Sequence, residues 1–221
     1  MENDQPDTGL VKDIRGKILH GFKLYVLEHG QIPPSVYKFA EILNIPETEF
    51  YEHFTSFGAL RSALWVESFD RTLANLYDQE IYGEYSAREK LLAFFFTWIE
   101  ELKKDRSYLL VLYDQSHPTS KFPPSEVSQF RERFKEFAKS ILMEGKESEE
   151  IAKRPFISDR YDEGLWLQVW FIFRFWIKDS STSFEKTDVA IEKSVHLAFD
   201  LMGKNSLDSM VDFAKFLFQN K

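Results

Sequence analysis

Residues 18–60 decide the fold, and they read ILHGFKLYVLEHGQIPPSVYKFAEILNIPETEFYEHFTSFGAL. Apolar residues recur at helical spacing in this stretch and are interrupted twice, which predicts three short helices. Gly30 and Pro33-Pro34 end the first helix, because neither residue type readily continues one. Asn44-Ile45 forms the second connection. Helices this short are not stable alone in water, so the three must pack together as a small unit that contains a helix-turn-helix.

The expected helices have identifiable starts and buried faces. Ser35 can cap the second helix with its side-chain oxygen, and Pro46 suits the first turn of the third. The buried faces would be Val11, Ile14, Ile18, Phe22 and Val26 on the first helix, Val36, Phe39, Ala40 and Leu43 on the second, and Phe50 and Phe54 on the third. The third helix then turns outward Glu47, Thr48, Glu49, Glu52 and His53.

This pattern resembles the DNA-binding head of the tetracycline-repressor (TetR) family over roughly residues 11–65, without a gap. The matching positions are Ile18-Leu19, Glu28, Gly30, Ser35-Val36, Ala40, Ile45, Tyr51, His53-Phe54, Ser56 and Leu60. The resemblance implies that the second helix braces on the phosphate backbone and that the third enters the major groove. It therefore implies that bases are read by Glu47, Thr48 and Glu49, and that phosphates are held by Ser35, Tyr51 and His53.

The same stretch departs from the family pattern in residue type and in charge. Phe57 stands where the family has a lysine that touches phosphate, Thr48 where it has glycine or alanine, and Asn44 where it has the glycine of the turn. Residues 1–57 hold nine acids against five bases, which leaves this segment at minus four. DNA binding depends heavily on cations that displace counterions. Two alternatives follow: specific binding of low affinity, or a head that has lost DNA binding.

The composition of the whole chain excludes several classes of protein. A hydrophobic content of 43% with 22 Phe in 221 residues is enough for a sizeable core. The net charge of −8 argues against a general nucleic-acid coat or a protein that binds anionic membranes. Zero cysteines exclude disulfides, thiolate metal sites and a cysteine nucleophile. We find no signal-peptide pattern, and we expect a cytoplasmic protein without a membrane segment.

Downstream of Ser56 the pattern is helical throughout, so the sequence predicts an all-α chain. Ser56 can cap a long helix that ends near Tyr77, and Ser86 with Glu89 forms a capping box for the next one. We expect residues 1–57 to hold a polar tail and the three-helix head. Residues 58–221 would form a ligand-binding and dimerisation body of six to seven helices.

The expected helix over residues 162–179 is apolar on every side, which requires cover on every side. The resembled family dimerises through a four-helix bundle of its last long helices. We therefore expect a two-fold homodimer built on about residues 162–202, with Trp166, Trp170 and Phe173 split between the core and the seam. Arg174 should be buried and paired, with a carboxylate or with an anionic ligand head group.

The last helices have their own boundary signals. Thr182 and Glu185 offer a capping box, and Gly203 should end a helix that runs from Val189 to Met202. A final helix would bury one face, formed by Leu207, Met210, Val211, Ala214, Leu217 and Phe218.

No catalytic motif or cofactor motif is present, so we expect neither an enzyme nor a cofactor. The nearest candidate for a metal site is Glu192 with His196, which lacks the paired motifs of a di-iron bundle. We expect His196 to be a core or interface histidine, and we expect no metal.

An aromatic helical body implies a site for an apolar or amphipathic small molecule, as the resembled family has. The candidate ligand-binding residues are Trp98, Tyr113, Trp166, Trp170 and Arg174. The alternative is that these aromatic residues are simply core. The sequence thus predicts a ligand-responsive dimeric repressor that binds palindromic operator DNA. The alternative function is a helical small-molecule-binding or interaction protein whose head no longer binds DNA.

Overall fold

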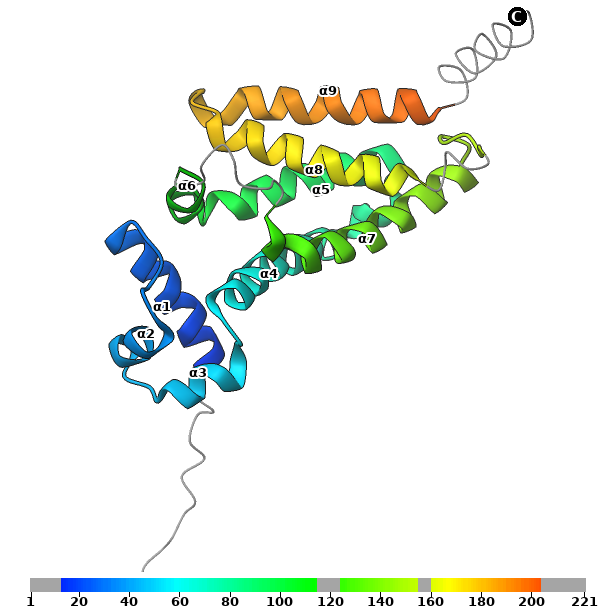
Figure 1. Ribbon diagram of the computed structural model, residues 1–221. Coiled ribbons are helices and arrows are strands. Elements are labelled where there is room, and N and C mark those ends of the chain that lie inside the picture. The colour runs from blue at the N-terminus through cyan, green and yellow to red at the C-terminus, as the bar shows by residue number, and fades with distance from the viewer. Residues whose placement is uncertain (1–12, 115–123, 155–159, 204–221) are drawn as a thin grey trace, which may run out of the picture.

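The regular structure of the computed structural model is entirely helical over the residues that it describes, 13–114, 124–154 and 160–203. The helices are α1 (Ile14–His29), α2 (Val36–Leu43), α3 (Glu47–His53), α4 (Phe57–Tyr77), α5 (Ala87–Lys103), α6 (Arg106–Asp114), α7 (Ser128–Glu147), α8 (Tyr161–Lys178) and α9 (Glu185–Met202). In Figure 1, α1–α3 form a head at the lower left, and α4 runs from it into a body made of the later helices. The predicted all-α fold class is confirmed.

The head forms where the local signals placed it. Ser35 accepts a hydrogen bond from the Lys38 N–H at 3.2 Å and so caps α2. Gly30 ends α1 in the left-handed conformation, and Asn44 ends α2 in the same way with φ 52°. Phe22 is fully buried, as are the other residues at the centre of the head, Ile18, Val26, Phe39 and Phe50.

Gly21 of α1 lies close to the Leu43 side chain of α2. A Cβ atom added at Gly21 would lie only 2.4 Å from Cδ2 of Leu43. A larger residue at this position would therefore require the Leu43 side chain to shift.

The body is built on an aromatic core between α4, α5, α7 and α8. The capping box at the start of α5 is confirmed, since the Ser86 N–H donates to Glu89 at 2.8 Å and the Glu89 N–H donates to the Ser86 hydroxyl at 3.3 Å. The inner face of α7 is buried as well, and it is formed by Phe130, Phe134, Phe137, Ala138 and Ile141. Figure 1 shows α8 and α9 side by side along the top of this body.

The turn between α8 and α9 differs from the expected Thr182–Glu185 capping box. The Asp179 carboxylate accepts hydrogen bonds from the Thr187 N–H (2.9 Å) and hydroxyl (2.6 Å), and from the Ser181 N–H (2.8 Å) and hydroxyl (2.7 Å). Burial alone would raise the pKa of Asp179, but these bonds lower it to about 2. The predicted capping box is wrong, because Asp179 already caps the start of α9.

Two further expectations concern the ends of the molecule. No helix in the described ranges is long and apolar enough to cross a membrane. The final helix expected around Leu207–Phe218 lies outside the described residues, as does Val11.

Candidate nucleic-acid interface and ligand site

The turn between α2 and α3 presents α3 outward from the head. The Ile45 N–H donates to the Ala40 carbonyl at 3.1 Å, which closes the turn after Asn44. Phe50 and Phe54 anchor the inner side of α3 in the head core. Of the six candidate DNA-contacting residues, Ser35, Thr48, Tyr51 and His53 are exposed, and Glu47 and Glu49 are half-buried. All six therefore reach the surface of the head at least in part, Ser35 at the start of α2 and the other five on α3.

Three of the six candidates make hydrogen bonds within the head. The Ser35 side-chain oxygen caps α2, so its role at a phosphate would add to a structural role. The Tyr51 hydroxyl lies 3.5 Å from Oε1 of Glu47, a long hydrogen bond between neighbouring turns of α3. Tyr51 and Glu47 thus occupy one patch of the helix, with Glu52 and His53 exposed beside it.

The cations of the head are mostly committed to carboxylates of the same chain. Arg15 pairs with Glu67 in α4, the Lys23 Nζ atom lies 2.7 Å from Asp105, and Lys38 lies 3.2 Å from Glu41. Lys17 has no ion pair within the described ranges. The outward surface of α3 itself holds no lysine or arginine. The electrostatic field at this surface is consequently weakly attractive, at best, to phosphate.

Phe57, which stands where the resembled family has a phosphate-binding lysine, packs into the head. Its ring lies 5.4 Å from Phe22, 5.6 Å from Phe39 and 5.7 Å from Phe50, measured between ring centroids. The first of these contacts is stacked and the other two are edge-on, the arrangements that aromatic pairs favour. The position therefore contributes packing and no positive charge.

Most of the candidate ligand residues come together in the aromatic core of the body. Trp98 is fully buried, and its ring centroid lies 5.6 Å from Phe130 and 6.4 Å from Phe173. Tyr113 lies 4.8 Å from Phe173, and burial raises the pKa of its hydroxyl. Trp166 and Trp170 line the same cluster and are buried too.

The core also holds an unpaired polar atom. The indole Nε1 of Trp98 is buried and has no hydrogen-bond partner within the described part of the chain. An unmade hydrogen bond of this kind costs about 1 to 3 kcal/mol. A ligand with a hydrogen-bond acceptor beside this atom would satisfy it.

Arg174 is placed differently from the expectation. It is exposed on the outer side of α8, so the prediction that it is buried is wrong. It lines an open groove of about 750 Å³ with Phe171, Phe175, Lys178 and Lys186. The physical reason is that this side of α8 faces away from the aromatic core.

The outer side of α8 and α9 carries a large apolar face. It is formed by residues other than those that the sequence predicted at the dimer seam. Leu167 is 67% exposed, Phe171 49% and Phe175 37%, and Val189, Leu197 and Leu201 are exposed on α9. Trp166, Trp170 and Phe173 are wholly in the core, so the expected split between core and seam is wrong. The signal that marks the outer face is the three- and four-residue spacing of Leu167, Phe171, Arg174 and Lys178.

The histidine singled out as a metal candidate has another partner. His196 is exposed in the single chain, so it is not a core histidine, and its Nδ1 lies 3.0 Å from NH1 of Arg88. Among the described residues no group of three or more metal-ligating side chains comes together. His117 lies outside those residues.

Comparison with known proteins gives consistent results. A family model described as the tetracyclin repressor-like C-terminal domain matches residues 90–217. The TetR transcriptional regulator from Nitrosomonas europaea has a TM-score of 0.59 at 15% identity, over 84% of this chain and 97% of that one.

Two structures from Rhodococcus are similar as well. One is a protein with unknown function, with a TM-score of 0.58 at 16% identity over 91% of this chain and 100% of that one. The other is a bacterial regulatory protein in the tetR family, with a TM-score of 0.54 at 14% identity over 88% and 99%. At these identities the likeness concerns the fold. No curated protein sequence matches the chain.

Proposed function

The chain belongs to the tetracycline-repressor family, and on that premise we propose that it is a ligand-responsive dimeric repressor that binds palindromic operator DNA. The observation that carries the proposal is the head, in which a capped α2, a left-handed turn and an outward α3 form a helix-turn-helix. In this proposal residues 1–57 bind DNA, and residues 58–221 bind the ligand and the second subunit.

The outer face of α8 and α9 supports the proposed dimer. Exposed apolar patches of this extent are rare on monomers and mark interaction surfaces. A groove of about 740 Å³ runs between the two helices. Its floor includes the small residues Ala190, Ser194 and Ala198, and Leu197 and Leu201 stand beside it. A second copy, related by a two-fold axis, would place its own leucines in this groove.

The dimer is tested by Phe171→Glu. We expect this change to raise the dimer dissociation constant by roughly 100-fold or more, because each subunit would lose an apolar ring from the seam and would have to desolvate a carboxylate there. Sedimentation at micromolar concentration should then give a monomer mass with unchanged helix content. The matched control is Met143→Glu, at a 61% exposed position on α7 outside both grooves, which should stay dimeric. A monomeric wild type would contradict the proposal.

The proposed DNA contacts follow the family arrangement. Glu47, Thr48 and Glu49 would face the bases, and Ser35, Tyr51 and His53 the phosphates, as the resemblance implies. A glutamate can accept a hydrogen bond from the amino group of cytosine, which discriminates bases by roughly 1 to 3 kcal/mol. Acids that do not make such a contact lie near phosphate charge and weaken binding.

Glu52→Lys tests this electrostatic account. Because Glu52 is exposed beside the proposed contact surface, a lysine there should raise affinity for all DNA and steepen the salt dependence by about one ion. Glu47→Ala or Glu49→Ala should instead blur sequence preference. Titrations at two salt concentrations measure the first effect, and selection from random oligonucleotides measures the second.

The control for Glu52→Lys is Glu84→Lys, which makes the same charge change at an exposed position in the body. It should leave the salt dependence almost unchanged. If the wild type selects no sequence even at low salt, the operator-binding part of the proposal is wrong.

A second candidate function is favoured by the ion pairs of the head. Arg15, Lys23 and Lys38 are each engaged by a carboxylate of the same chain, which leaves few cations for phosphate. The alternative is therefore a small-molecule-binding or interaction protein of the same fold, whose head does not bind DNA. The random-oligonucleotide selection separates the two functions.

The proposed ligand is apolar or amphipathic and binds in the aromatic core, at the cluster of Trp98, Tyr113, Trp166 and Trp170. Its polar part would accept a hydrogen bond from Nε1 of Trp98. Arg174 is not part of this cluster, because it lies on the proposed dimer face.

A further inference from the structure

Two adjacent residues at the corner between α5 and α6 hold opposite parts of the molecule. Asp105 pairs with Lys23 of α1, and Arg106 holds the carboxyl end of α8. We infer that this Asp105–Arg106 corner positions the head relative to the α8 end of the proposed dimer face. Its consequence at DNA rests on the proposed function, whereas the link itself rests on the contacts described here.

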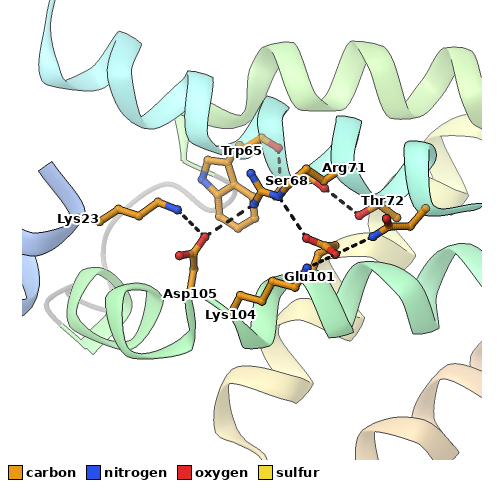
Figure 2. A network of polar contacts seen from close by, with 9 residues as sticks. Lys23, Trp65, Ser68, Arg71, Thr72, Glu101, Lys104 and Asp105 are labelled. Carbon is orange, nitrogen blue, oxygen red and sulfur yellow. Dashed lines mark hydrogen bonds and ion pairs between the residues drawn. The ribbon is translucent and has the colours of Figure 1, made fainter. Parts of the chain in front are cut away.

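The contact on the head side crosses from one part of the molecule to the other. Figure 2 shows Lys23 reaching from α1 to the Asp105 carboxylate, with 2.7 Å between Nζ and Oδ2. Both side chains are about three-quarters buried, with exposed fractions of 21% and 25%. Partial burial reduces the screening of this pair by solvent and salt. Among the described ion pairs of the head, it is the one that reaches past α4 to the α5–α6 corner.

The corner is itself fixed to the body by a buried network. Arg71 of α4 lies between two carboxylates, with Nε 3.1 Å from Glu101 and NH2 3.8 Å from Asp105 (Figure 2). Glu101 is 2% exposed and also accepts from Asn75 at 2.7 Å. Burial alone would raise the pKa of Glu101, but the bonds from Lys104 and Arg71 lower it, so the carboxylate stays charged. Asp105 therefore moves with α4 and α5 and not as a free side chain.

The contact on the other side holds a helix end. The Arg106 guanidinium donates to the carbonyls of Trp176 at 3.0 Å, Ile177 at 3.3 Å and Asp179 at 3.1 Å. The last carbonyls of a helix have no partner within it and favour a cation. The guanidinium also lies 4.7 Å from the ring centroid of Trp176 and 4.5 Å from that of Phe184.

The consequence is a short physical connection between two distant surfaces. The end of α8 that Arg106 holds also carries Phe175 and Lys178, which line the groove on the outer face. Asp105 and Arg106 are joined by one rigid peptide bond. In this inference, a displacement of the end of α8 is passed through Arg106 to Asp105, and from Asp105 to Lys23 and α1. The head that presents α3 is packed on α1, so its position follows.

The link can be measured by the distance between the head and the body. The chain has no cysteine, so Gln31→Cys in the head and Glu136→Cys on α7 give two defined labelling sites at exposed positions. Spin labels at these sites, in chains diluted with excess unlabelled protein, give one intramolecular distance distribution by pulsed electron paramagnetic resonance.

The first variant removes the cation of the head. Lys23→Met should broaden or shift the head–body distribution, and Lys23→Arg should restore it, because an arginine can still reach the carboxylate. The matched control is Lys17→Met, the same change on the same helix at an exposed position. An unchanged distribution in Lys23→Met would overturn the inference.

The second variant tests transmission through the corner. Arg106→Gln removes the fork that holds α8 and leaves Lys23 and Asp105 intact, yet it should broaden the same distribution. Phe184→Leu is a milder second variant, which removes one of the two aromatic rings that contact the Arg106 guanidinium. It serves as the test if Arg106→Gln does not fold. If both variants leave the head–body distance as in the wild type, the corner does not couple α8 to the head.

A DNA readout separates this inference from the proposed function. With half-sites at varied spacing, Arg106→Gln should accept a wider range of spacings than the wild type at equal affinity for one half-site. A monomer that binds no DNA would refute the proposed function, while the distance measurement would still decide the link. A dimer that selects an operator with unchanged distances in every variant would refute the link alone.

Discussion

Trp170→Glu is expected to unfold the body, whereas Phe171→Glu, one residue further on, should leave it folded. Trp170 is 5% exposed, and its ring lies 5.5 to 6.1 Å from those of Phe173, Trp166 and Trp65. A carboxylate among these rings would lose its hydration, which is costly for a charged group. Together with the lost packing, we expect a loss of more than about 4 kcal/mol in the free energy of unfolding.

The pair is measured by urea unfolding followed by circular dichroism. Trp170→Glu should show a large loss of stability or no folded baseline. Phe171→Glu should keep a cooperative unfolding transition, although it sediments as a monomer. Trp170→Phe is the conservative control, since it keeps an aromatic ring in the cluster. If Trp170→Glu keeps the stability of the wild type and becomes monomeric, then Trp170 faces a second subunit and the orientation of α8 is wrong.

The orientation of α8 could not be read from its composition. A helix that is apolar on every side has no polar stripe to show which side faces the core. The sequence therefore predicts that α8 needs cover, but it split Trp166, Trp170 and Phe173 between the core and the seam. The structure places these large rings inward, where they meet aromatic residues of α4, α5 and α7.

The same limit explains the error at Arg174. Arg174 was expected to be enclosed, because eleven of the thirteen residues from Leu165 to Ile177 are apolar. Successive residues of a helix point in directions about 100° apart, so Phe173 can be buried while Arg174 and Phe175 are exposed. The charge and spacing of Arg174 and Lys178 mark the exposed side of α8 only once the buried side of the helix is known.

Local signals predicted the head and most helix boundaries correctly. The caps at Ser35, Ser56 and Ser86 and the left-handed positions Gly30 and Asn44 each depend on residues a few positions apart. The contacts that join distant segments have no such signal. Lys23 and Asp105 lie 82 positions apart, and Asp179 caps α9 through Thr187, although the local Thr182–Glu185 spacing predicted a capping box there. The roles of the six proposed DNA-contacting residues stay predictions.

Phe57→Lys is expected to weaken the head and not to strengthen DNA binding. A lysine would restore the residue type that the family resemblance implies at this position. It would also remove a half-buried ring that contacts Phe22, Phe39 and Phe50 at 5.4 to 5.7 Å. Loss of an aromatic ring from such a cluster costs about 3 kcal/mol. Because the head is small, we expect this loss to destabilise it as a whole. The amides of α1–α3 in Phe57→Lys should therefore exchange with deuterium faster than in the wild type, and faster than those of the body.

Phe57→Leu is the matched control for this change. It keeps an apolar side chain and should lose only part of the stability, with no effect on charge. If Phe57→Lys did not destabilise the head, its amides would exchange with deuterium like those of the wild type. The variant would then bind nonspecific DNA more tightly, with a steeper salt dependence. That outcome would mean that the ring adds nothing to the head and that the departure from the family pattern removed only a phosphate contact. Faster exchange in α1–α3 without a gain in DNA binding would instead mean that this chain uses the position for packing, so that its DNA affinity must come from the exposed residues of α2 and α3.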